Sequence, residues 1–218
     1  MHEIIHKVVV GVFVCALAAP PAGAQSADHP DLLWQQATLY RDEWGVPHVY
    51  ADNLRAMSFA LGYAQAEDHL EPMLLAYRAA EGRLSELYGE AFVASDTLAI
   101  QLGHGDLARA VYDNADPITR ELCEGFALGV NTWLLEHYDT APPWAEGVNA
   151  TDVLALLHAY LMSHAPFDLP GAYRRPPGTP SANAWATAPS RSPEGVAMLV
   201  MNPHSDYNDV FRWYEMHL

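Results

Sequence analysis

The stretch that decides the fold runs from residue 166 to residue 201, PFDLPGAYRRPPGTPSANAWATAPSRSPEGVAMLVM. Its first fifteen residues contain five prolines and two glycines, which disfavour helix and strand alike. Two short apolar runs follow, at 184–188 and 196–201, with a Ser-, Pro- and Gly-containing turn between them. This pattern predicts an exposed linker over 166–180 and then a hairpin of two buried strands.

The residues before the linker are predicted to be mostly helical, after two short strands at 37–41 and 44–50. From Asn53 onward apolar residues recur at spacings of three and four, which is typical of helices packed on one side. This stripe includes Leu70, Met73, Leu74 and Tyr77.

Two further helix starts are indicated by capping residues. Asp116 followed by Pro117 is a cap with a first-turn proline, and the next helix is predicted to be capped near Thr151 or Asp152. A helical block followed by strands predicts an α+β protein. Because two strands alone do not make a stable sheet, we expect further strands from missing chain or from another polypeptide.

The first 24 residues have the pattern of a secretory signal peptide. One lysine, an apolar run at 8–19 and the small residues Ala22, Gly23 and Ala24 predict cleavage before Gln25. That run is too short to span a bilayer, and no later segment supplies about 18 uninterrupted apolar residues. We therefore expect a periplasmic or secreted protein without a membrane span.

Charge and residue usage exclude several classes of function. The formal net charge is −16, so the surface would repel phosphates, and nucleic acid is not an expected partner. Lys7 is the only lysine, which leaves no Schiff-base or phosphate-loop lysine after signal cleavage. Cys123 is then the only cysteine, so no internal disulfide can form.

No metal site is identifiable in the sequence. Glu67, Asp68 and His69 are consecutive, and consecutive helical side chains point in different directions, so a solvated helix face is expected there. His158 and His164 are six positions apart, which fits no helical metal pair, and we interpret them as core or pocket-wall histidines.

Several segments, in order, resemble the penicillin acylase family of N-terminal nucleophile hydrolases, in particular its acyl-homoserine-lactone and aculeacin acylase branch. These segments are YRDEWGVPHVYADN (40–53), LGYAQAEDHLEPM (61–73), AEGRLSELYGE (80–90), SANAWATAPSRS (181–192) and MNPHSDYNDVFRWYEMHL (201–218). The resemblance implies part of a four-layer αββα sandwich. Residues 25–165 would form the helical α-segment and residues 181–218 the start of the β-segment.

The resemblance also implies an activity. A family precursor cleaves itself so that a serine becomes the new N-terminus, and the freed α-amino group then serves as the base for the serine hydroxyl. An α-amino pKa of about 7.7–8.0 suits that role and exists only after the cut. The implied reaction is hydrolysis of the amide bond of an N-acyl compound, such as an acyl-homoserine lactone or a β-lactam.

Two registers place the nucleophile differently. In the family the nucleophile is followed by Asn, a small residue and Trp, which match residues 183–185, so its position is held by Ala182. Alternatively the register shifts by one and Ser181 is the nucleophile, although a serine beside a proline is also typical of a turn. The spacing to His204, where the branch has a histidine near the nucleophile, favours the register of Ala182. Without the resemblance, His204 would be interpreted as a turn residue.

The resemblance assigns substrate contacts to Trp185 and Ser205, and it places the helix that carries His158 beside the acyl pocket. It implies calcium, whose ligands, like the oxyanion asparagine, belong mostly to chain beyond residue 218; no other cofactor is expected. Two alternatives stay open. Besides the amidohydrolase, the chain could be an inactive remnant that binds an acyl ligand, or an α-subunit that needs a separate β chain. A purely helical scaffold would not explain the linker and the strand pair.

Overall fold

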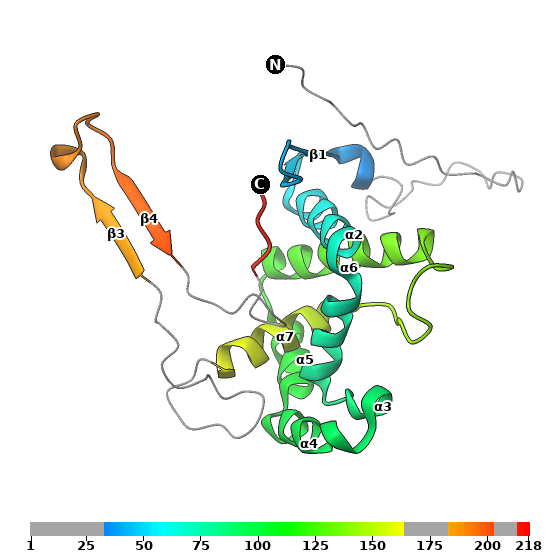
Figure 1. The fold of residues 1–218 in the computed structure, drawn as a ribbon. Coiled ribbons are helices and arrows are strands. Elements are labelled where there is room, and N and C mark those ends of the chain that lie inside the picture. The colour runs from blue at the N-terminus through cyan, green and yellow to red at the C-terminus, as the bar shows by residue number, and fades with distance from the viewer. Residues whose placement is uncertain (1–32, 164–182, 203–212) are drawn as a thin grey trace, which may run out of the picture. The chain divides into compact units, whose positions relative to one another are not determined.

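The computed structural model describes residues 33–163, 183–202 and 213–218 (Figure 1). Within these ranges the chain forms two compact units. The first unit contains the described residues up to Ala159 together with Tyr214–Leu218, and the second contains the described part of Tyr160–Trp213. The predicted signal peptide at 1–24 and linker at 166–180 lie outside the described residues.

A two-stranded antiparallel hairpin begins the first unit. It follows the 3-10 helix η1 (Trp34–Gln36) and pairs β1 (Ala37–Arg41) with β2 (Pro47–Ala51), so that Tyr40 lies opposite His48. The prediction of a strand at 37–41 is confirmed. The second strand begins three residues later than predicted.

The turn of this hairpin explains the later start. Gly45 has a φ of 80°, a left-handed conformation that favours glycine. The carboxylate of Asp42 accepts the backbone N–H groups of Trp44 and Val46, both at 2.9 Å. Residues 44–46 therefore belong to the turn, a local arrangement typical of aspartate.

Helices α2 (Leu54–Glu81) and α6 (Pro117–Glu136) form the centre of the first unit (Figure 1). Asn53 caps α2 by accepting a backbone N–H of the first turn. Asp116 accepts the backbone N–H of Thr119 at 3.1 Å, which confirms the cap predicted at this position. Both helices therefore start where short polar side chains can satisfy a free N–H group.

Glycine allows the backbones of α2 and α6 to come close together. A Cβ atom added at Gly62 of α2 would lie 2.2 Å from the carbonyl oxygen of Phe126. One added at Gly129 of α6 would lie 2.0 Å from the carbonyl oxygen of Phe59. Neither position has room for a side chain, because real Cβ atoms do not approach backbone atoms so closely.

The predicted apolar stripe packs at this contact. Leu70, Leu74 and Tyr77 of the stripe belong to the main core cluster. Val148, in the loop before the last helix, belongs to the same cluster. The cluster contains Ala66, Leu70, Leu74, Tyr77, Phe126, Ala127, Val130, Leu134 and Val148.

A kink divides α2 at His69, whose φ of −145° and ψ of 34° are not helical. Pro72 lies three residues further on inside the helix. A proline has no N–H and its ring clashes with the carbonyl group four residues earlier, which here belongs to Asp68. The kink is therefore attributed to this proline.

Next to the kink, Glu67 and Asp68 bind the same guanidinium group. Nη2 of Arg41 lies 2.6 Å from Glu67 Oε2, and Nη1 lies 2.9 Å from Asp68 Oδ2. The hydroxyl of Tyr214 donates to Asp68 at 2.5 Å. Both carboxylates are exposed, which confirms the expected solvated helix face, and they also share the guanidinium group of Arg41. Consecutive side chains cannot meet on one small ion, but the two ends of a guanidinium fork can each take one of them.

Four short helices connect α2 to α6. They are α3 (Ser85–Tyr88), η2 (Gly89–Phe92), α4 (Val93–Leu102) and α5 (His104–Asn114). The buried carboxylate of Asp96 in α4 accepts the backbone N–H groups of Leu84 and Ser85, at 3.0 and 2.7 Å. This carboxylate fixes the turn between α2 and α3.

A buried arginine holds the loop that follows α6. Arg78 is 7% exposed and binds Glu86 of α3 at 2.7 Å and Glu146 of the loop at 2.8 Å. Its guanidinium also donates to the carbonyl oxygen of Trp144 and lies over that indole ring, 5.5 Å from the centroid. Since the cation is paired on both sides, its burial is compensated.

The last helix, α7 (Ala150–Ser163), begins one to two residues before the predicted cap. Asp152 accepts the backbone N–H of Asn149 at 2.7 Å, so its carboxylate reaches back to the residue before the helix. This is the reciprocal half of a capping arrangement, in which the third helical residue bonds the cap. The prediction therefore identified a capping residue but gave it the wrong position.

The second unit contains the predicted hairpin, with β3 (Asn183–Thr187) antiparallel to β4 (Met198–Asn202). The strands are confirmed, but their predicted burial is wrong. Trp185 is 62% exposed and its cross-strand partner Val200 is 55% exposed. A two-stranded sheet has no layer of its own to cover either face.

Two strand pairs and a mainly helical body make the described chain an α+β structure, as predicted. None of the helices within the described ranges is long and apolar enough to cross a membrane.

Because α2 and α6 lie so close together, a single methyl group added between them should destabilise the protein. We expect Gly129→Ala to lower the free energy of unfolding by about 1–3 kcal/mol, because the new Cβ forces the two backbones apart. Urea denaturation monitored by circular dichroism measures this loss.

The matched control is Gly105→Ala in α5, where the nearest atom to an added Cβ is the flexible end of Arg109 at 3.4 Å. This variant should be neutral or slightly stabilising. Equal stability of the two variants would contradict close backbone packing.

Candidate functional site

The candidate nucleophile positions directly precede β3. Ser181 and Ala182, like His204 and Ser205, lie outside the described residues. The described neighbour of Ala182 is Asn183, which begins β3 and pairs in register with Asn202, the end of β4. The hairpin therefore brings together the residue after the candidate nucleophile and the residue two positions before the candidate histidine.

Trp185 lies in the middle of β3. Alternation along the strand places it on the same face as Asn183, two Cα pairs further into the hairpin. With 62% of its surface exposed, the indole is available for contact with a ligand or another part of the protein. The substrate-binding role of Trp185 stays a prediction.

A histidine pair joins α7 to α5 in the first unit. Nδ1 of His158 lies 2.8 Å from Nδ1 of His104, and the rings meet edge to face with centroids 4.8 Å apart. His158 was interpreted as a core or pocket-wall histidine, and it is partly buried here. His164, the other histidine of that prediction, lies outside the described residues.

The pair has a defined protonation chemistry. A hydrogen bond between two Nδ1 atoms needs a donor on one ring and a lone pair on the other, so at least one ring is neutral. His104 is completely buried, and this burial together with the nearby His158 lowers the pKa of His104 to about 4. His104 is therefore a neutral side chain at physiological pH.

Sequence reasoning missed His104. It is the first residue of α5, directly after Gly103, which has a φ of 65° and ends α4. A histidine after a helix-ending glycine has no periodic signal, and its partner lies 54 residues away. Nothing in the local sequence could have identified the pair.

The described residues do not fit a metal site. Among them, no group of three or more histidine, cysteine, aspartate or glutamate side chains is arranged to hold a metal ion. The calcium implied by the resemblance stays a prediction, because its ligands are expected mostly beyond residue 218.

The described chain is an α+β structure of helices and two hairpins, and the comparison with protein families identifies the family to which it belongs. Residues 36–218 match the family model described as penicillin amidase. The chain belongs to the penicillin amidase family, which confirms the resemblance found in its motifs.

Particular relatives include an acyl-homoserine lactone acylase PvdQ from Pseudomonas fluorescens, which is 26% identical over 84% of this chain and 28% of its own length. Penicillin G acylase of Escherichia coli is 32% identical over 44% of this chain and 11% of its own length. An acyl-homoserine lactone acylase QuiP from Pseudomonas aeruginosa is 31% identical over 50% of this chain. The chain thus spans less than a third of the length of these relatives.

The fold has a counterpart among solved structures. A thermostable penicillin G acylase from Alcaligenes faecalis superimposes with a TM-score of 0.52 at 23% identity, over 59% of this chain and 80% of that one. The match supports the prediction of a partial N-terminal nucleophile hydrolase fold.

The histidine pair predicts a loss of stability in mild acid. An unfolded histidine ionises near pH 6.5, whereas folded His104 stays neutral down to about pH 4, so the unfolded state binds more protons between these values. We expect the free energy of unfolding to fall by about 2 kcal/mol between pH 7 and pH 5. Urea titrations at a series of pH values measure the slope.

His104→Phe, which fills a similar volume without titrating, should remove most of this slope. The matched control is His137→Gln at the end of α6, which should retain it. If His104→Phe is folded at pH 7 and keeps the parental slope, the assignment to His104 is wrong.

Proposed function

We propose that this chain forms part of an amidohydrolase that cleaves the amide bond of an N-acyl compound, such as an acyl-homoserine lactone or a β-lactam. The observation that carries the proposal is the family match over residues 36–218, which extends through the hairpin β3–β4. The printed names of the relatives, acyl-homoserine lactone acylase and penicillin G acylase, support the choice of substrates. The signal-like residues 1–24 support a periplasmic or secreted location.

The proposed chemistry begins with cleavage before a serine at the start of the β-segment. The new α-amino group takes the proton from the serine hydroxyl, and the oxygen attacks the substrate carbonyl. The acyl group passes first to the serine and then to water, with loss of the amine. The exposed linker that the sequence predicts at 166–180 suits such a cut, since exposed segments are the usual sites of chain cleavage.

The residues at this point also favour a second function. In the register favoured by His204, Ala182 holds the family's nucleophile position and has no hydroxyl, whereas in the shifted register Ser181 is the nucleophile. If Ser181 is not the nucleophile, the chain is an acyl-binding protein without catalysis, or an α-subunit that acts with a separate β chain. The register of Asn183 opposite Asn202 is compatible with both functions.

Intact-mass measurement with N-terminal sequencing tests the proposal. The protein is expressed from its complete gene, including any sequence that follows residue 218. For the enzyme, we expect a new N-terminus at Ser181 and release of homoserine lactone from an N-acyl substrate. An uncut, folded protein that binds an acyl-homoserine lactone without hydrolysing it would support the binding function instead.

Ala182→Ser separates the two registers. If Ala182 holds the nucleophile position, the substitution should create cleavage before residue 182 and raise acylase activity by orders of magnitude. The matched control is Ala184→Ser, which adds a hydroxyl at an exposed position of β3 and should leave processing unchanged. No cleavage in a folded Ala182→Ser protein would exclude this register.

A further inference from the structure

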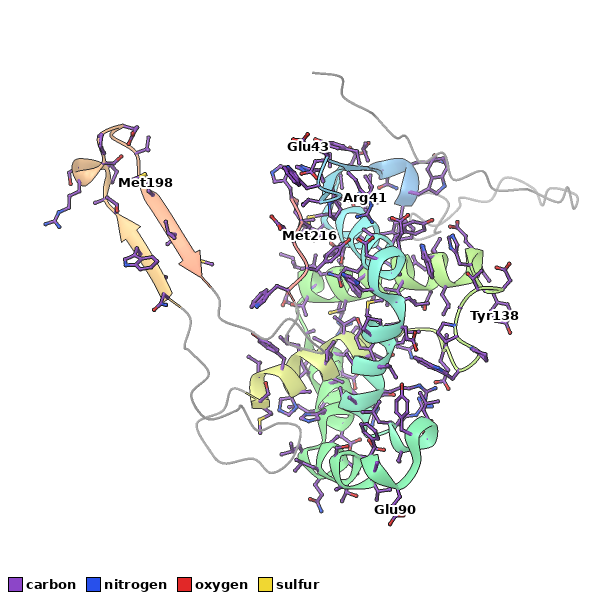
Figure 2. All side chains as sticks on the ribbon, viewed as in Figure 1. Arg41, Glu43, Glu90, Tyr138, Met198 and Met216 are labelled. Atoms are coloured by element: carbon purple, nitrogen blue, oxygen red, sulfur yellow. The ribbon has the colours of Figure 1, made fainter. Side chains whose placement is uncertain are left out.

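An open hollow lies in the first unit, on the hairpin β1–β2. The hollow has a volume of about 710 Å³ and is open to solvent. Its lining comes from the hairpin β1–β2 with its turn and from the segment Tyr214–Leu218. This volume is in the range of small-molecule sites. Figure 2 shows Arg41, Glu43 and Met216, which carry labels, at this end of the unit.

Backbone hydrogen bonds hold the C-terminal segment of the lining against β2. The N–H of Val49 donates to the carbonyl oxygen of His217 at 2.9 Å, and the N–H of His217 donates to that of Pro47 at 3.0 Å. His217 therefore lies beside β2 as a short parallel bridge. Asp68 anchors the same segment through the hydroxyl of Tyr214.

Aromatic rings form most of the lining. Tyr40 stacks on His48 with centroids 5.1 Å apart and on Tyr50 at 5.6 Å, because alternate residues of paired strands share one face. The imidazole of His217 stands edge-on to His48, with centroids 5.2 Å apart. Trp44 extends from the turn with 82% of its surface exposed, so the face of its indole is open to a ligand.

The charges of the lining have one sign. Asp42 and Glu215 contribute carboxylates, and no lysine or arginine lines the hollow. Desolvation works to raise the pKa of Asp42, but the hydrogen bonds from the backbone of Trp44 and Val46, together with the nearby imidazole of His48, outweigh it and keep the pKa below its usual value. Arg41, the nearest arginine along β1, binds Glu67 and Asp68 of α2 on the other face of the strand.

We propose that this hollow binds a small organic cation with apolar substituents, a quaternary ammonium group above all, between the Trp44 and tyrosine rings and the carboxylates of Asp42 and Glu215. The electron-rich faces of tryptophan and tyrosine attract cations, and methyl groups on the nitrogen give apolar contact with the rings. An anion would meet two carboxylates without a compensating cation. A purely apolar ligand would gain no electrostatic attraction from those carboxylates.

Choline and its neutral isostere 3,3-dimethylbutan-1-ol test the charge requirement. The two differ only in a quaternary nitrogen in place of a quaternary carbon. Ligand-observed NMR titration of the purified chain at pH 7.5 and low salt should show choline binding with a Kd of about millimolar. The isostere should bind at least tenfold more weakly.

Variants test the location. An exposed cation–π contact corresponds to a factor of about two to five in affinity and to more when it is desolvated, so Trp44→Ala should weaken choline binding about fivefold. Glu215→Gln should weaken it about two- to threefold, and less at high salt. The matched control is Tyr138→Ala, a 79% exposed aromatic residue outside the hollow, which should leave the Kd unchanged.

Equal binding of choline and its isostere would overturn the proposal, and so would an unchanged Kd in a Trp44→Ala protein that melts like the parent. Absence of choline binding would overturn it as well. None of these outcomes depends on Ser181 or Ala182, so acylase activity and cation binding can fail independently.

Discussion

The direct contact of two helix backbones, at Gly62 of α2 and Gly129 of α6, is the constraint on which the first unit depends. Most other elements of the first unit pack on helix α2, namely β1, β2, α4 and α5. The carboxylates that hold Arg41 and the arginine that holds the loop before α7 also belong to α2. A change in the spacing of the two helices would therefore move the hollow at one end of α2 and the buried Arg78 at the other.

Features that depend on neighbouring residues were predictable from the sequence. The strand at 37–41, the cap at Asp116 and the strands on either side of the 189–195 turn follow from local propensities, capping chemistry and turn residues. Errors of one to three residues occurred at the starts of β2 and α7. In both places an aspartate carboxylate bonds backbone N–H groups that precede or follow it, and more than one choice of partner fits the sequence.

Long-range partners were not predictable. Glu67 and Asp68 are exposed, as expected, but nothing in the sequence indicates that Arg41, 26 residues from Glu67, binds both of them. The hydrogen bond between His104 and His158 likewise joins residues that are 54 positions apart, and no local pattern predicts it. For the candidate site, the sequence and its family resemblance predict Ser181 or Ala182 and His204, which lie outside the described residues, and the hairpin adds only the register of their neighbours. The predicted burial of β3 and β4 failed because burial requires a covering layer, which a strand's own sequence cannot specify.

The bridge between His48 and His217 has a consequence for how the chain folds. The two residues are 169 positions apart, so their pairing closes a loop that contains nearly all of the first unit's helices. Contacts of such high sequence separation form late, because the entropy of loop closure is lost before the contact is gained. During synthesis, which proceeds from the N-terminus, β2 must wait with a free edge until residue 217 has left the ribosome. The aromatic hollow is therefore among the last parts of this unit to assemble, after the glycine-lined helix pair has already formed.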